Sequence, residues 1–125
     1  MMAGRNPYSS TVLEHFRRPR NQGPMPDASA SAEGVNPLCG DRVRMAVMID
    51  AGGSITEAQF VANACAICVA SASLLTERIR GWSRDSAASL SDEEVLALIG
   101  EPVPPARRRC ATLPLETLRR ALAVE

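Results

Sequence analysis

Two alternating segments near the middle of the chain constrain its fold more than any other feature. Residues 42–50 place four apolar side chains on one face and two arginines on the other, as a half-buried β-strand does. A second β-like run covers residues 55–62, and Gly52-Gly53 between the runs permits a tight turn. The pattern therefore predicts an antiparallel β-hairpin. The side chains expected to face inward from its first strand are Val43, Met45, Val47 and Ile49.

Directly after this hairpin, the spacing of apolar residues changes to that of a helix. Residues 66–80 carry apolar side chains at intervals of three and four, and Gly81 marks the end of the pattern. Cys65 is therefore expected at or beside a helix N-terminus. Free N–H groups and the positive end of the helix dipole favour a thiolate there.

The remaining segments predict further helices and one weak strand. One helix is expected at 8–17, with Tyr8 and Phe16 on its apolar face, and a short one at 83–90. A third should follow the capping box at 91–94 and end at Gly100. From Arg107 onward the chain is expected to be helical again, with Pro114 in the first turn of a closing helix. Residues 27–34 are expected to form a poor edge strand. Together these elements predict an α+β fold, with a small antiparallel sheet of about three strands and helices packed on one face.

The four cysteines of the chain are expected to serve metal ligation or thiol chemistry. The 125 residues have the size of one domain. The chain starts without the apolar stretch of a signal peptide, and no apolar run approaches the ~20 residues of a membrane span. We therefore expect a soluble, cytoplasmic protein, in which disulfides are rare. A net charge of zero argues against recruitment of nucleic acid or an anionic membrane. The alternative is that the cysteines are small buried hydrophobes.

Three of the cysteines have flanking residues that favour a shared site. Cys39 lies in a loop two residues before Asp41, whose carboxylate can bind the same ion or accept a hydrogen bond within the turn. Cys110 follows the arginines 107–109, whose charge is expected to lower its pKa. We predict that Cys39, Cys65 and Cys110 meet in space and hold a metal ion or an iron–sulfur cluster.

Cys68 and His15 are expected to lie outside this site. Cys65 and Cys68 form a Cys-x-x-Cys motif, but the chain lacks the second such motif of a zinc knuckle and the aromatic and Gly-Pro flanks of a thioredoxin-type pair. Cys68 is therefore interpreted as a small core residue, with an auxiliary thiol as the alternative. His15, the single histidine, lies beside an apolar helix face and is interpreted as a packed or hydrogen-bonded residue.

Four segments, in order along the chain, carry the motifs of a known family. They are Pro19-Arg20-Asn21-Gln22-Gly23, Asn36-Pro37-Leu38-Cys39-Gly40-Asp41, Cys65 with Ala70-Ser71-Ala72-Ser73, and Cys110-Ala111-Thr112-Leu113. From Tyr8 to its end, the chain resembles the IscU/SufU/NifU N-terminal family of iron–sulfur cluster assembly scaffolds. The resemblance implies a SufE/NifU-like fold, with residues 1–125 as a single scaffold domain. It also implies that Cys39, Cys65 and Cys110 are cluster ligands, and that Asp41 tunes cluster lability or zinc binding.

The chain departs from the family pattern at three places. Ala64 stands where a glycine usually precedes the second cysteine, and Arg109 stands where the IscU type has a histidine. Arginine cannot bind a metal at neutral pH, so a fourth ligand must be Asp41, a partner residue, water or the incoming sulfur. A basic residue at 109 resembles SufU, yet the chain lacks the extra segment that SufU carries between its second and third cysteines.

Residues 103–107 match the IscU chaperone-binding motif in part. The favoured interpretation of this segment is a rigid entry into the Cys110 helix.

The resemblance implies a scaffold that accepts persulfide sulfur from a cysteine desulfurase, binds iron, assembles a labile [2Fe-2S] cluster and transfers it to apo-proteins. Cys110 is the candidate persulfide acceptor, and Cys65 and Cys39 are the other catalytic candidates. The alternative is a SufU-type zinc-dependent sulfurtransferase, with zinc on Cys39, Asp41, Cys65 and Cys110. A third interpretation is an α+β interaction domain with buried cysteines. The implied partners are the desulfurase and apo iron–sulfur proteins, with a chaperone as a further candidate and neither nucleic acid nor membrane.

Overall fold

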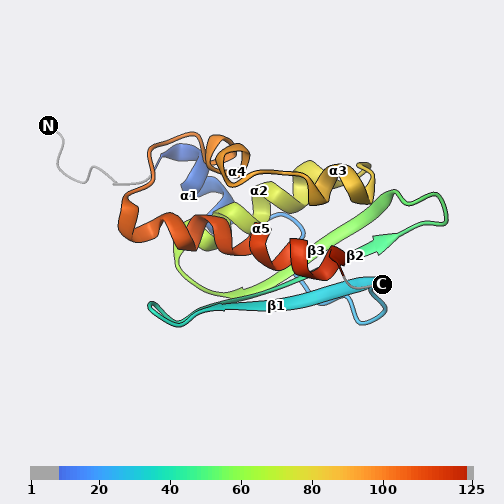
Figure 1. Ribbon diagram of the computed structural model, residues 1–125. Coiled ribbons are helices and arrows are strands. Elements are labelled where there is room, and N and C mark those ends of the chain that lie inside the picture. The colour runs from blue at the N-terminus through green and yellow to red at the C-terminus, as the bar shows by residue number, and fades with distance from the viewer. Residues whose placement is uncertain (1–8, 124–125) are drawn as a thin grey trace, which may run out of the picture.

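The computed structural model describes residues 9–123, which form a three-stranded antiparallel sheet with helices on one of its faces (Figure 1). The elements are α1 (Ser10–Arg17), β1 (Ala30–Asn36), β2 (Asp41–Ile49), β3 (Ile55–Asn63), α2 (Ala66–Ile79), α3 (Arg84–Ala88), α4 (Asp92–Ile99), the 3₁₀ turn η1 (Pro105–Arg107) and α5 (Arg108–Ala123). The strand order β1-β2-β3 joins each strand to the next in the sequence. The predicted α+β fold is confirmed.

The core lies between the inner face of the sheet and the helices α2 and α5. The predicted hairpin consists of β2 and β3, and the β2 residues Val43, Met45 and Val47 are buried on its inner face. Phe60 of β3 is buried beside them, opposite Met45 in the strand register. The rest of the core is almost entirely aliphatic, so its stability depends on close packing of small and branched side chains.

Helix α5 lies directly on strand β1, and glycine makes this contact possible. A Cβ atom added at Gly34 would lie 2.0 Å from Oγ1 of Thr117 and 3.2 Å from the Leu113 side chain. One turn further along α5, the Arg120 guanidinium reaches over the strand and donates to the carbonyl of Glu33. The last part of α5 is thus fixed against β1.

The other outer strand, β3, is also accompanied by a segment of chain. The N–H of Phe60 donates to the carbonyl of Asn21 (2.9 Å), and the N–H of Gly23 donates to the carbonyl of Phe60 (2.8 Å). Asn21 has a positive φ of 61°, which asparagine tolerates better than most residues. Residues 21–23 therefore run beside β3 before the chain continues to β1.

Ser73 of α2 connects the packed helix α1 to this connecting segment. Its hydroxyl oxygen accepts the backbone N–H of Arg20 (2.8 Å) and lies 2.7 Å from Nδ1 of His15. His15 is buried and hydrogen-bonded, as expected.

Several predicted boundaries hold, and one prediction about α5 is wrong. The capping box at Ser91 is present, and Gly100 ends α4 with a left-handed φ of 78°. The edge strand begins and ends later than expected, as β1. Pro114 does not open a separate closing helix, because α5 is continuous through it. Tyr8, the expected start of the first helix, lies outside the described residues. None of the helices in the described part of the chain has the length and apolar character needed to cross a membrane.

Candidate metal centre

Cys39 lies at the tip of the β1–β2 hairpin, held there by Asn36. The carbonyl of Asn36 accepts the N–H groups of Cys39 (3.3 Å) and Gly40 (2.8 Å), and its side-chain Oδ1 accepts the N–H of Leu38 (3.2 Å). Gly40 has a φ of 79°, the left-handed conformation that glycine adopts without strain. The turn leaves Cys39 exposed. Local sequence therefore fixes how this thiol is presented.

Asp41, directly after this turn, has one satisfied and one unsatisfied carboxylate oxygen. It begins β2 and is only 4% exposed. Its Oδ1 accepts the backbone N–H of Cys65 (3.0 Å). Its Oδ2 is buried and has no hydrogen-bond partner, the one such side-chain atom found among residues 9–123. Burying a carboxylate oxygen without a hydrogen-bond partner costs free energy. A proton or a cation bound to this atom would offset that cost.

Cys110 and Cys65 approach the same carboxylate from two different helices. Cys110 lies in the first turn of α5 and is 1% exposed, and its Sγ is 3.6 Å from Sγ of Cys39. Cys65 is the N-cap of α2, as predicted, but its side chain makes no capping hydrogen bond. Its thiol is therefore not engaged by the helix that it begins.

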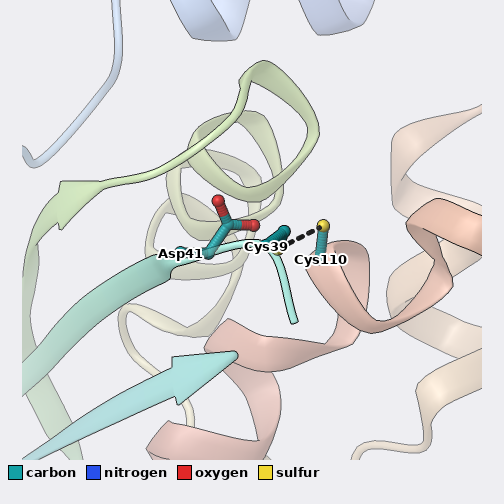
Figure 2. Close-up of side chains that lie close together, drawn as sticks. All are labelled: Cys39, Asp41 and Cys110. Carbon is teal, nitrogen blue, oxygen red and sulfur yellow. Dashed lines mark hydrogen bonds between the residues drawn. The ribbon is translucent and has the colours of Figure 1, made fainter. Parts of the chain in front are cut away.

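The structure brings three of the four predicted ligands into one group. One ligand atom each from Cys39, Asp41 and Cys110 lies within 4.8 Å of the other two. Figure 2 shows them converging from the hairpin loop, the start of β2 and the first turn of α5. Cys65 is not a member of this tight group. Its backbone nevertheless bonds Asp41, and its thiol is close enough to affect the pKa values of both Asp41 and Cys110.

The pKa values of the group show how it is held together. Burial alone would raise the pKa of Asp41, but the adjacent Cys110 thiol, the hydrogen bond from the Cys65 N–H and the adjacent Cys39 thiol outweigh burial and keep the pKa below its usual value. Burial, followed by the neighbouring Asp41 carboxylate and the contact with the Cys39 sulfur, raises the pKa of the Cys110 thiol far above its usual value. Cys110 therefore keeps its proton when no cation is present.

The expectation that residues 107–109 lower the pKa of Cys110 is wrong. All three arginines are exposed, whereas the thiol is buried beside a carboxylate. Desolvation and the neighbouring negative charge outweigh arginine charges that water screens. Arg109 in particular lies on the surface and not in the group of donors.

The donor set fits a thiophilic metal. Two thiolates bound at about 2.3 Å to a tetrahedral zinc ion lie about 3.8 Å apart, close to the 3.6 Å between Cys39 and Cys110. Asp41 supplies a desolvated oxygen that lacks a partner in the described structure. Thiolate sulfur with one carboxylate oxygen suits zinc, and thiolates are the usual ligands of iron in clusters. Cys65, beside the group, is available as a further sulfur donor.

Two nearby residues play structural roles that the sequence indicates only in part. Cys68 is completely buried in the core, and burial raises the pKa of its thiol far above the usual value. This agrees with its interpretation as a core residue. Ser71, which the sequence shows only as part of the motif after Cys65, packs against α5: its hydroxyl donates to the carbonyl of Ala111 (2.6 Å).

Comparison with known proteins gives matches along nearly the whole chain. The family model described as "NifU-like N terminal domain" matches residues 7–124. The zinc-dependent sulfurtransferase SufU of Bacillus subtilis is 33% identical, covering 94% of this chain and 90% of SufU. The scaffold protein IscU of Haemophilus influenzae is 30% identical, covering 93% of each. The bifunctional protein NifU/MnmA of Rubrobacter xylanophilus is 36% identical over 91% of this chain, which spans only 23% of that protein.

Solved structures show the same architecture. A putative iron–sulfur cluster assembly scaffold for the SUF system from Fervidobacterium islandicum aligns with a TM-score of 0.78 and 25% identity, covering 92% of this chain and 96% of that one. The N-terminal NifU-like protein of Brucella abortus aligns with a TM-score of 0.73 at 19% identity, covering 92% and 91%. The sheet, the helical layer and the chain order are therefore shared with these proteins.

Proposed function

Because the chain belongs to the NifU-like N-terminal domain family, we propose that it is an iron–sulfur cluster assembly scaffold, with residues 1–125 acting as one scaffold domain. The observation that carries the proposal is the Asp41 carboxylate: its buried Oδ2 lacks a hydrogen-bond partner within the described residues, and one of its oxygens lies within 4.8 Å of the Cys39 and Cys110 sulfurs. A purely structural aspartate would be expected to satisfy both oxygens. The proposed ligands are Cys39, Asp41, Cys65 and Cys110.

The proposed cargo is a [2Fe-2S] cluster, built from iron and from persulfide sulfur that a cysteine desulfurase delivers and that an external two-electron reductant converts to sulfide. A thiolate of this chain attacks the outer sulfur of the donor's persulfide. A new S–S bond forms on this chain, the S–S bond of the donor breaks, and the donor cysteine leaves as a thiolate. Cys39 is the exposed thiol of the group, so it is the one that a partner protein can reach first. Cys110, the acceptor that the sequence suggested, is buried and would have to become exposed before it could accept sulfur.

Transfer of the cluster to apo-proteins requires a site that binds the cluster reversibly. The donors come from three separate elements, and Cys39 lies on an exposed hairpin tip. Asp41 provides a hard oxygen, which binds iron less durably than thiolate sulfur does. We propose that this mixed donor set makes the cluster labile.

A chaperone contact at residues 103–107 stays a prediction. Val103 packs against the core and η1 leads directly into α5, which supports the interpretation of this segment as a rigid entry into the Cys110 helix.

A second candidate function is zinc-dependent sulfur transfer. Arg109 replaces the histidine ligand of the IscU type and is exposed, and the distance between the Cys39 and Cys110 sulfurs suits tetrahedral zinc. The alignment with B. subtilis SufU extends over 135 positions, more than this chain contains, so that relative carries residues absent here. In this function zinc is the resident ion, and one cysteine leaves it to accept sulfur.

Reconstitution separates the two functions. The purified protein is incubated anaerobically with a cysteine desulfurase, ferrous iron, cysteine and a dithiol reductant that converts persulfide sulfur to sulfide. A scaffold develops the visible absorption of a [2Fe-2S] cluster and passes it to an apo-ferredoxin. A sulfurtransferase keeps one zinc ion per chain and stimulates the desulfurase without forming a chromophore. Metal content of freshly purified wild type and Cys110→Ser gives an independent check, since loss of a ligand should lower it. A protein that binds neither zinc nor cluster contradicts both functions.

A further inference from the structure

The side chain of Ser71 connects the two helices that contribute cysteines to the centre. Ser71 is 1% exposed, and its hydroxyl donates to the carbonyl oxygen of Ala111 at 2.6 Å. Ala111 follows Cys110 directly and is completely buried. The helix that carries Ser71 begins at Cys65, its N-cap. One buried hydrogen bond therefore joins the helix that begins at Cys65 to the turn that presents Cys110.

The backbone of α5 is weakened at the same place. Pro114 lies inside the helix and has no N–H, so the carbonyl of Cys110, four residues earlier, loses its usual helical donor. The proline ring also crowds that carbonyl. Ser71 donates a hydrogen bond to the next carbonyl along the chain, that of Ala111. The first turn of α5 thus gains from a side chain of α2 some of the restraint that its own hydrogen-bond ladder lacks.

The opposite end of α5 is anchored independently of Ser71. Arg119 donates to the carbonyl of Leu90, and Arg120 donates to the carbonyl of Glu33. These contacts fix the last turns against the segment before α4 and against β1. Loss of the Ser71 hydroxyl should therefore leave the helix docked and release mainly the turn that contains Cys110.

We propose that Ser71 is a positioning residue for the metal centre, whose hydroxyl sets the place of the Cys110 thiol relative to Cys39 and Asp41. The proposal rests on the proposed function, because it requires that these side chains bind a metal. A site whose ligands are displaced by a few tenths of an ångström binds less tightly, and groups that support metal ligands typically contribute about 10–100-fold to affinity. Ser71 acts through the backbone of the ligand's neighbour and does not touch the ion.

The test compares Ser71→Ala with Ser73→Ala. Ser73 lies in the same helix and is equally buried, and its hydroxyl is also hydrogen-bonded, but to Arg20 and His15 on the side of α1. The two variants thus each remove one hydroxyl from the same helix, Ser71→Ala on the side of α5 and Ser73→Ala on the side of α1.

Zinc affinity is measured by competition with a chromophoric chelator. Bound Co²⁺ is examined by its absorption, since the d–d and sulfur-to-metal bands report how many thiolates surround the ion and whether they are tetrahedral. Thermal melting of the metal-free proteins reports stability.

We expect Ser71→Ala to lower zinc affinity at least about tenfold and to weaken or shift the Co²⁺ bands. Ser73→Ala should keep the wild-type spectrum and stay within about threefold of wild-type affinity, although it melts earlier than wild type. The proposal is overturned if Ser71→Ala changes affinity no more than Ser73→Ala does, or keeps the wild-type Co²⁺ spectrum. If the wild-type protein itself binds neither ion, the proposed metal centre fails, and this result is distinct from a failure of Ser71 alone.

Discussion

The Oδ1 atom of Asp41 accepts the backbone N–H of Cys65 across 3.0 Å, so one carboxylate connects the start of β2 to the start of α2. The other oxygen, Oδ2, has no hydrogen-bond partner within the described residues, and the carboxylate lies in the group with Cys39 and Cys110. The two oxygens have different tasks, one holding the backbone and one available to a cation. Substitutions that preserve one task and remove the other can therefore separate them.

Replacing Asp41 tests this division. Asp41→Asn keeps an oxygen that can accept the Cys65 N–H, so the start of α2 should stay in place while the charged ligand is lost. Asp41→Ala removes both. We expect zinc affinity to fall in both variants, and an assembled cluster to be released to an apo-acceptor more slowly, because a weak oxygen ligand has been removed. Chelator competition and the loss of cluster absorption after acceptor addition measure these effects.

The stability of the metal-free variants provides the control for Asp41. Loss of the hydrogen bond should make Asp41→Ala less stable than Asp41→Asn by about 1 kcal/mol, measured by urea unfolding. Faster cluster release in either variant, or unchanged zinc binding in both, would contradict the assigned role of Asp41.

Thiol alkylation should follow exposure in the metal-free protein and ligation in the zinc form. Without metal, we expect iodoacetamide to modify Cys39 first, because it is exposed, and Cys110 more slowly, because it is buried. Zinc should protect Cys39, Cys65 and Cys110 together. Cys68 should react slowly in both forms, since it is completely buried. Mass spectrometry of tryptic peptides gives each rate. Equal rates with and without zinc would instead favour an interaction domain with buried cysteines.

Gly34→Ala should destabilise the protein strongly. The added Cβ would lie 2.0 Å from Oγ1 of Thr117, a buried residue of α5, so helix and strand must move apart at a cost of about 1–3 kcal/mol or more. Gly52→Ala is the matched control, because its nearest atom is an ordinary 3.5 Å away. Thermal melting measures both. Adding Thr117→Ala to Gly34→Ala should recover part of the loss if the clash is its cause.

Stability should fall between neutral and mildly acidic pH because of His15. Burial, assisted by the charge of Arg20 and opposed by Glu77 and Glu14, lowers the pKa of His15 below 6.5 in the folded state. The unfolded chain therefore binds the proton first as the pH drops. The contribution of neutral His15 is fully present above the unfolded pKa of about 6.5 and is lost below it, with a slope of at most about 1.4 kcal/mol per pH unit.

The control for this pH dependence is His15→Gln, which cannot titrate in that range. Urea unfolding of the metal-free proteins at pH 7.5, 6.5 and 5.5 should show a smaller loss of stability for the variant than for wild type. Parallel pH profiles would show that His15 is not the group responsible.

The parts of the fold predicted correctly from the sequence are those that short-range patterns determine. The alternation in residues 42–50 identifies β2, and the capping box at Ser91 locates the start of α4. Pro114 misled the prediction because proline favours a first helical turn in general. Here the packing of α5 on β1 and α2 outweighs the hydrogen bond that Pro114 removes.

The site was predictable in its residues more than in its geometry. The motif around Cys39 and Asp41 indicated the ligands, and the position of Cys65 as a helix N-cap followed from periodicity. No local pattern shows that Oδ2 of Asp41 is buried without a partner, or that Cys110 is covered, because both depend on how α5 packs on the sheet. The raised pKa of Cys110 followed from that packing and not from the arginines beside it in the sequence.

The arrangement at the two margins of the sheet limits how other proteins can approach. Residues 21–23 run along β3 at Phe60, and the Arg120 side chain donates to the Glu33 carbonyl of β1. An incoming peptide would have to displace these groups before it could extend the sheet as a fourth strand. Docking by strand addition is thus discouraged, and a visiting protein is left to approach end-on, where the hairpin tip presents its sulfur.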